Sequence, residues 1–300
     1  MRVTVTGATG RVGGALVGAL RERGDEVTVL SRHPDKARRM LGVDAVAWDP
    51  ANETAPAEGL NGRDAVVHLA GEDVAQRWTD DAKRRILESR ETGTRNLVAG
   101  LRDSDPRPRV LVSASAVGWY GPHGDEKLTE DVPAGSDFLA EVVTAWEREA
   151  DRATDLGLRV VEVRTGVVLD KDGGALSKML PFFKLGIGGP VAGGRQYLPW
   201  IHLDDVVGIY LAALDGHDWS GPVNATAPEP ATNKDFSRAL GRAIHRPAFA
   251  PVPGLAVKAL YGDMAEIVTG GQRAIPRRPL ELGYRFQHRD LDEALRSAVA

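Results

Sequence analysis

Short apolar stretches alternate with longer amphipathic ones along the first 170 residues of the chain. The short stretches are rich in Val and Leu and predict strands at residues 3–6, 26–30, 45–49, 65–71, 109–115 and 158–169. The longer ones repeat apolar residues three or four positions apart and predict helices at residues 12–20, 34–40, 80–101 and 136–147. Strands and helices that alternate in this way are typical of an α/β fold with a parallel sheet.

Two of these elements carry further detail. The stretch 65–71 is apolar almost throughout, as expected of a strand that is buried on both faces of a parallel sheet. The helix over 80–101 contains Gly93, and we expect it to be interrupted or bent there.

The alternation of strands and helices ends near residue 170. The segment 186–194 holds five glycines and predicts either a mobile loop over a crevice or a solvent-exposed connection. Helices are predicted again over 206–214 and 233–245. We therefore predict a Rossmann-type, doubly wound parallel sheet in residues 1–170, completed by a strand from the later chain, and a smaller, mainly substrate-binding lobe in residues 171–300.

A glycine-rich turn joins the first strand to the first helix, in the pattern Thr-Gly-x-x-Gly-x-x-Gly. Glycines at these positions allow a sharp turn, a close approach of the backbone to a phosphate, and tight packing of the helix on the sheet. The N–H groups at the helix N-terminus are free to bind an anion. The turn therefore predicts a dinucleotide site, held by Gly7, Thr9, Gly10, Arg11, Val12 and Gly13.

The end of the second strand indicates which dinucleotide is bound. Enzymes that use NAD usually have an acidic residue there for the ribose 2′-OH, whereas a 2′-phosphate needs a cation and a small hydrogen-bond donor. Ser31 and Arg32 occupy this place and favour NADP(H). A solvated Arg that precedes the next helix is the alternative.

The glycine spacing resembles the extended short-chain dehydrogenase/reductase superfamily. The resemblance implies that Asp49 faces the adenine amino group, although an Asp that opens a turn before Pro50 explains the residue as well. It also implies that the turn Leu69, Ala70 and Gly71 contacts the cofactor. The neighbouring His68 is more simply a satisfied residue at the end of a strand.

The stretch 113–121, Ser-Ala-Ser-Ala-Val-Gly-Trp-Tyr-Gly, resembles the superfamily's fifth-strand signature. In that signature a Ser holds the substrate oxygen beside the nicotinamide, which implies Ser115, with Ser113 as its neighbour. The superfamily then requires a Tyr and, four residues later, a Lys whose charge lowers the pKa of the phenol. The matching positions hold Phe138 and Val142.

Tyr120 is the nearest remaining candidate for the proton donor. The alternative is that it forms an aromatic wall of the pocket.

Segments throughout the chain resemble one atypical branch of the superfamily, the epimerase-like family 39U, also described as nucleoside-diphosphate-sugar epimerase-like proteins. They are residues 113–121, 137–147, 164–169, 200–205, 224–228 and 262–265. The resemblance implies that the turn Thr165, Gly166 and Val167 lies along the nicotinamide half of the cofactor. A structural salt bridge is the simplest role for Arg164, which precedes this turn.

Composition narrows the function classes further. The net charge is −4 without a long basic run, so nucleic acid is not an expected partner. The chain has no Cys, which excludes disulfides and thiolate chemistry, and no His/Asp cluster with metal-ligand spacing predicts a metal site. No uninterrupted apolar stretch is long enough to span a membrane, and residues 1–6 already read as a core strand. We expect a cytoplasmic protein, as a monomer or homodimer, with a small-molecule substrate.

These observations lead to one leading hypothesis and one alternative. The leading hypothesis is an NADP-dependent oxidoreductase or epimerase that acts on a small polar carbonyl or a sugar-nucleotide-like compound, with Ser115 and Tyr120 at the reacting centre. The alternative is a non-catalytic NADP(H)-binding sensor or scaffold, which the missing Tyr and Lys favour.

Overall fold

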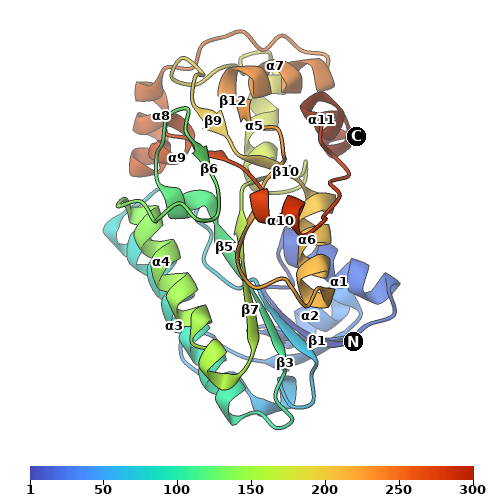
Figure 1. The fold of residues 1–300 in the computed structure, drawn as a ribbon. Coiled ribbons are helices and arrows are strands. Elements are labelled where there is room, and N and C mark those ends of the chain that lie inside the picture. The colour runs from blue at the N-terminus through green and yellow to red at the C-terminus, as the bar shows by residue number, and fades with distance from the viewer.

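A seven-stranded parallel sheet forms the centre of the computed structural model (Figure 1). The model describes the backbone of residues 1–300 and the side chains of all of them except 260 and 261. The strand order across the sheet is β11-β7-β5-β4-β1-β2-β3. In chain order the strands are β1 (Arg2–Thr6), β2 (Glu26–Ser31), β3 (Asp44–Ala47), β4 (Ala65–His68), β5 (Val110–Ala116), β7 (Arg159–Thr165) and β11 (Gly221–Ala225).

Helices cover both faces of this sheet (Figure 1). One face packs against α1 (Arg11–Glu22), α2 (Pro34–Leu41) and α6 (Leu203–Asp215), whose apolar side chains share one core with the strands. The other face packs against α3 (Asp80–Asp103) and α4 (Phe138–Asp151). Burial on both faces explains why these strands are rich in apolar residues such as Val.

The strand order reverses between β1 and β4. The chain runs outward from β1 through β2 to β3, and then returns to the other side of β1 to place β4, β5 and β7. In doubly wound sheets, ligands bind outside the carboxyl ends of the strands at such a reversal. The fold therefore places a crevice at the ends of β1 and β4.

The later chain builds a second apolar core beside the sheet. Its helices are α5 (Gly174–Lys184), α7 (Asn233–Ala243), α8 (Gly254–Tyr261), α9 (Ala265–Thr269), α10 (Arg277–Glu281) and α11 (Leu291–Val299). Short strands lie among them: β8 (Val167–Leu169), β9 (Tyr197–Leu198), β10 (Trp200–His202), β12 (Ala231–Thr232) and β13 (Arg273–Ala274). The last of these pairs with β6 (Lys127–Leu128), which comes from the earlier chain. The core itself forms mainly between α5, α7 and α11, where Leu180, Phe236 and Leu295 are buried.

Two predicted elements differ in the structure. The helix α3 runs without interruption through Gly93, which is buried and lies close to Pro50. The predicted strand 158–169 is two strands, β7 and β8, separated at Gly166. The N–H of Gly166 donates to the carbonyl of Ala225, 3.0 Å away, and this contact with β11 could not be read from the local pattern.

The later chain also returns to the sheet, as predicted, through β11, while the boundary at residue 170 stays a prediction. The glycine-rich segment 186–194 packs against residues 246–252 and makes a bridge between Val191 and Val252. Among the described residues, no helix combines the length and the apolar character that crossing a bilayer requires.

Candidate functional site

The turn between β1 and α1 has the geometry that the glycine pattern predicts. Gly7 adopts φ of +66°, and a Cβ there would lie 2.5 Å from the carbonyl carbon of Leu69. A Cβ on Gly13 would lie 2.4 Å from the carbonyl oxygen of Gly7. Gly10 differs, because the carbonyl oxygen of Gly7 at 3.3 Å is the only described atom within 4 Å of its Cβ position. The backbone at Gly10 is therefore open to a ligand.

The N-terminus of α1 faces this opening without a cap of its own. Gly10 is the N-cap residue and offers no side chain, and the first turn holds no acidic residue. The first N–H groups of the helix have no intrahelical acceptor, so they and the helix dipole favour a phosphate. The side chains of Arg11 and Val12 point elsewhere: Arg11 pairs with Asp170 and Asp172, and Val12 packs on the core.

A cavity of about 370 Å³ lies beside this helix end. Its size falls in the range typical of small-molecule sites. Nine of the predicted cofactor residues line it: Gly7, Thr9, Gly10, Ser31, Arg32, Asp49, Leu69, Ala70 and Gly71. The structure therefore brings the predicted diphosphate and adenosine residues together in one place.

Arg32 is the free cation at the edge of this cavity. Its side chain is exposed and has no hydrogen bond or salt bridge within the part of the chain that the structure describes. It also lines an adjoining hollow together with Lys36 and Arg39 of α2. Ser31 Oγ accepts a hydrogen bond from the N–H of His33 at 3.1 Å and keeps its own proton available. This arrangement suits a phosphate on an adenosine ribose.

Asp49 also lines the cavity, but its carboxylate is already engaged. Its oxygens accept hydrogen bonds from the side chain of Asn52 at 2.8 Å and the N–H of Ala51 at 3.2 Å, and these bonds hold its pKa below the usual range. Asp49 thus has both predicted roles available: it stabilises the turn at Pro50, and it forms part of the cavity wall.

The turn after β4 is fixed by a buried polar network. Thr6 Oγ1 accepts hydrogen bonds from the N–H groups of Leu69 and Ala70, both at 3.2 Å. His68 is fully buried, with Nδ1 at 2.8 Å from Thr6 Oγ1 and Nε2 at 3.1 Å from Thr94 Oγ1. His68 is therefore the satisfied strand-end residue that the sequence suggested, and it holds the cavity wall in place.

The predicted nicotinamide-side residues lie at the carboxyl ends of β5 and β7. Residues 113–116 of β5 pair in register with 162–165 of β7, and Gly166 and Val167 continue from there. Gly166 is enclosed, because a Cβ there would lie 2.1 Å from the carbonyl oxygen of Pro199. None of Ser113, Ser115 or residues 165–167 lines the 370 Å³ cavity.

Ser115 belongs to a buried charged network. Its Oγ donates to Glu147 Oε1 at 2.5 Å. Arg164 binds both oxygens of Glu147 at 2.8 Å and stacks on the ring of Trp119, 3.9 Å from its centroid. Arg164 thus has the structural salt bridge that its sequence position suggested, since a buried guanidinium needs a paired carboxylate.

Tyr120 is fully buried in the same region. Its hydroxyl donates to Asn224 Oδ1 at 2.7 Å, and burial raises its pKa to about 12. A phenol in this environment is a weak acid near neutral pH. These surroundings favour the packing role over the proton-donor role, which stays a prediction.

The start of α4 confirms that the usual Tyr and Lys have no substitute there. Phe138 packs edge-on against Trp78, with ring centroids 5.1 Å apart, and Val142 is buried in the same apolar cluster. Phe138 and Val142 thus supply neither a phenol nor an ammonium at these two positions, although Lys83 Nζ of α3 lies 5.5 Å from the centroid of the Phe138 ring.

Sequence reasoning missed Arg90, which lies on α3 among other charged residues. Its guanidinium packs against Gly71, where a Cβ would lie 3.2 Å from Cζ. Gly71 lines the cofactor cavity, so this cation borders the site. The signal in the sequence was only a charge in the middle of a long amphipathic helix.

A cluster of His202, Asp204 and His288 was also missed, since His288 is remote in sequence. One ligand atom from each lies within 4.8 Å of the others. His202 Nδ1, however, accepts the N–H of Asp204 at 3.2 Å and caps α6. A metal ion at that nitrogen must break the cap, so the geometry favours a structural role.

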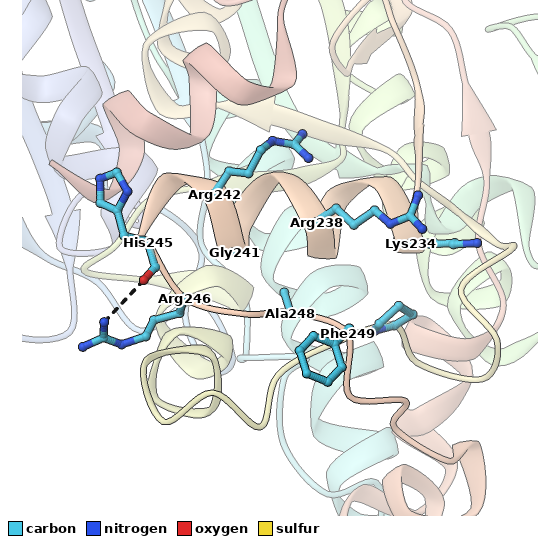
Figure 2. A pocket seen from close by; sticks show the side chains of 9 residues that line it. Lys234, Arg238, Gly241, Arg242, His245, Arg246, Ala248 and Phe249 are labelled. Carbon is cyan, nitrogen blue, oxygen red and sulfur yellow. Dashed lines mark hydrogen bonds between the residues drawn. The ribbon is translucent and has the colours of Figure 1, made fainter.

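A second hollow, of about 690 Å³, lies apart from the cofactor cavity (Figure 2). It runs between α7 and residues 246–249, and the two sites share no lining residue. Lys234, Arg238 and Arg242 extend from α7 along it, and the ring of Phe249 lies opposite. The cofactor residues are thus distinct from this basic surface.

Family models match most of the chain. Residues 3–224 match the NAD dependent epimerase/dehydratase family. Residues 252–298 match a domain of unknown function, DUF1731.

Individual relatives agree with the family models. The chain is 41% identical to the chloroplastic epimerase family protein SDR39U1 homolog of Arabidopsis thaliana, over 100% of this chain and 87% of that protein. The crystal structure of human epimerase family protein SDR39U1 (isoform 2) with NADPH is 37% identical, with a TM-score of 0.89 over 99% of both chains. The nucleoside-diphosphate sugar epimerase of Corynebacterium glutamicum is 35% identical, with a TM-score of 0.79 over 98% of this chain and 57% of that one.

Proposed function

Since the chain belongs to the epimerase family SDR39U1, within the NAD dependent epimerases and dehydratases, we propose that it is an NADP(H)-dependent oxidoreductase or epimerase. Its substrate is a small polar carbonyl or sugar-nucleotide-like compound. The proposal combines the cavity beside α1 with the chemistry of the residues that line it.

One observation carries the choice of cofactor. Arg32 is exposed, has no partner among the described side chains, and borders a cavity that also meets the uncapped N-terminus of α1. The two positive sites match the two anionic groups of NADP(H), the 2′-phosphate and the diphosphate. The human relative crystallised with NADPH supports the same assignment.

The reacting half of the site lies at the carboxyl ends of β5 and β7. The nicotinamide of NADP(H) supplies or accepts a hydride when it is bound. Ser115 donates its hydroxyl hydrogen bond to Glu147, so its oxygen remains as an acceptor, which suits a substrate hydroxyl. Tyr120 supports this region through Asn224 instead of exchanging protons.

The cofactor assignment is tested by titrating the purified protein with NADPH and NADH. We expect NADPH to bind more tightly, and Arg32→Ala to weaken NADPH binding by about 10- to 100-fold, since a charge-assisted hydrogen bond to phosphate is lost. NADH binding is expected to stay unchanged. Arg289→Ala removes another exposed arginine and serves as the matched control. Equal affinities for NADPH and NADH in the parent protein contradict the assignment.

A second candidate is an NADP(H)-binding sensor without turnover. The apolar packing of Phe138 and Val142 favours it, because the usual proton-transfer pair is absent. A panel of carbonyl compounds and sugar nucleotides separates the two, with NADPH absorbance as the readout for net oxidation or reduction and product stereochemistry as the readout for epimerisation, which leaves the cofactor unchanged overall. Oxidation of NADPH with any substrate supports the enzyme, and Tyr120→Phe then keeps the activity if Tyr120 is structural. Tight NADPH binding without turnover across the panel supports the sensor.

A further inference from the structure

Arg90 is a cation enclosed at the edge of the cofactor cavity. Its Nη1 donates to the carbonyl oxygens of Glu72 at 3.1 Å and Ile86 at 3.2 Å. The guanidinium lies over the ring of Trp146 on α4, 4.8 Å from its centroid. The side chain is therefore held between α3 and α4 in one orientation.

The described residues form no salt bridge to this guanidinium, although the carboxylates of Glu72 and Asp73 lie near enough to favour its charged form. Burial lowers the pKa of Arg90 to about 10, so the group stays protonated at neutral pH. An enclosed cation is costly unless an anion or several oxygen atoms surround it. The ring of Trp146 and two carbonyls compensate only part of that cost.

One unused donor of Arg90, Nη2, lies beside Gly71, a residue that lines the cavity. Every hydrogen bond that the structure gives Arg90 comes from Nη1, and Nη2 and Nε have no partner in the described part of the chain. Nη2 lies 3.3 Å from the position of a Cβ on Gly71. Gly71 lines the cavity together with Glu72 and Ser89, both of which contact Arg90. Since Gly71 has no side chain, it places none between Nη2 and the cavity.

Arg90 lies on the nicotinamide side of the site. The adenosine residues cluster at β1, β2 and the turn after β3, whereas Arg90 lies past β4 and contacts α4, the helix that covers β5. A dinucleotide that lies across the strand reversal places its two halves on opposite sides of it. On this side, α4 holds Val142 where the superfamily pattern requires a Lys.

We propose that Arg90 binds the ribose hydroxyls of the nicotinamide half of NADP(H) through Nη2 and Nε, and so supplies from α3 the cation that α4 lacks. This inference rests on the proposed NADP(H) function. It gives the site a second positive charge, remote from Arg32, that positions the reacting half of the cofactor.

Binding measurements with two probes test the inference. One probe is NADPH, and the other is adenosine 5′-diphosphate 2′-phosphate, which keeps both anionic groups but lacks the nicotinamide ribose. We expect Arg90→Met to weaken NADPH binding by about tenfold or more. Binding of the truncated probe is expected to change less than about twofold, because its groups lie at Arg32 and α1. Arg32→Ala is expected to weaken both probes.

Further variants keep the test decisive. Arg90→Lys keeps the charge and is expected to retain most of the NADPH affinity, and Arg84→Met, an exposed arginine of the same helix, is the control. If Arg90→Met does not fold, Arg90→Gln replaces it in the binding measurements with the same two probes. Equal weakening of both probes, or no weakening of NADPH, overturns the inference. A parent protein that binds neither probe overturns the proposed function itself.

Discussion

His68 shows how one buried side chain fixes the shape of the cofactor cavity. Thr6 Oγ1 accepts two N–H groups of the β4 turn, so its own proton points to Nδ1 of His68. The ring is therefore neutral, with its proton on Nε2 directed at Thr94. Burial lowers the pKa of His68 to about 4, from an ordinary value of 6.5.

This pKa shift predicts a loss of stability in acid. The folded state resists protonation of His68 and the unfolded state does not, so the unfolded state binds more protons between about pH 6.5 and about pH 4. Stability contributed by the neutral ring is therefore complete above pH 6.5 and falls as the pH drops toward 4.

We expect this contribution to fall by about 2 kcal/mol between about pH 7 and pH 4.5. Urea unfolding of the parent protein and of His68→Gln over this range measures it. The free energy of unfolding should fall less steeply with acid in the variant. Parallel pH profiles for the two proteins contradict the neutral, buried ring.

At the scale of single residues, the sequence predicted those site residues whose chemical role follows from the residue type alone. Glycines at fixed spacing and a cation after β2 are recognisable without a structure, and Gly7, Gly10 and Arg32 do line one cavity. Arg90 and Glu147 were not predicted, because their roles depend on contacts between α3, α4 and β5. A charge in an amphipathic helix looks the same whether it faces solvent or a ligand.

At the scale of elements, the glycines in the turn from β1 to α1 have different structural roles. Gly13 has no room for a side chain because of the carbonyl of Gly7, whereas Gly10 has room within the protein. Gly13 therefore allows α1 to pack closely against the turn, and Gly10 leaves space for a phosphate.

Two alanine substitutions separate these roles. We expect Gly13→Ala to lower the free energy of unfolding by about 1–3 kcal/mol, since its Cβ forces α1 away from the turn. Gly10→Ala should cost less than about 1 kcal/mol and weaken NADPH binding at least tenfold. Thermal unfolding and NADPH titration measure the two effects. Unchanged NADPH affinity in Gly10→Ala argues against a phosphate at that position.

The strands and helices of the sheet followed from periodicity, and most bounds agree within a few residues. The exceptions depend on long-range contacts. The helix α3 continues through Gly93, which packs close to Pro50, and the strand divides at Gly166 because β8 pairs with β10 whereas β7 pairs with β11. None of these partners is visible in the local sequence.

At the scale of the whole molecule, hydrogen bonds to α6 hold the C-terminal segment, at residues 284–288, against the sheet domain. Asp205 is fully buried in the first turn of that helix. Its carboxylate accepts hydrogen bonds from the N–H groups of Gln287 at 2.8 Å and His288 at 2.9 Å, and from the hydroxyl of Tyr284 at 3.2 Å. The N-cap of this helix is His202 rather than Asp205.

Loss of this carboxylate should loosen the C-terminal segment. In Asp205→Asn one oxygen becomes an NH₂ group that meets an N–H, so we expect a loss of about 2–3 kcal/mol in the free energy of unfolding. Hydrogen exchange at residues 284–288 should accelerate. Asp218→Asn, at an exposed position, is the control. Unchanged exchange in Asp205→Asn shows that apolar packing alone fastens the segment.

The central claim is that an adenine dinucleotide with a 2′-phosphate lies between α1 and Arg32. A crystal structure of the protein with NADPH tests it most directly. We predict electron density for the diphosphate at the first N–H groups of α1 and for the 2′-phosphate within hydrogen-bond distance of Arg32. An empty cavity at saturating NADPH, or a cofactor bound at the basic surface of α7, contradicts the account.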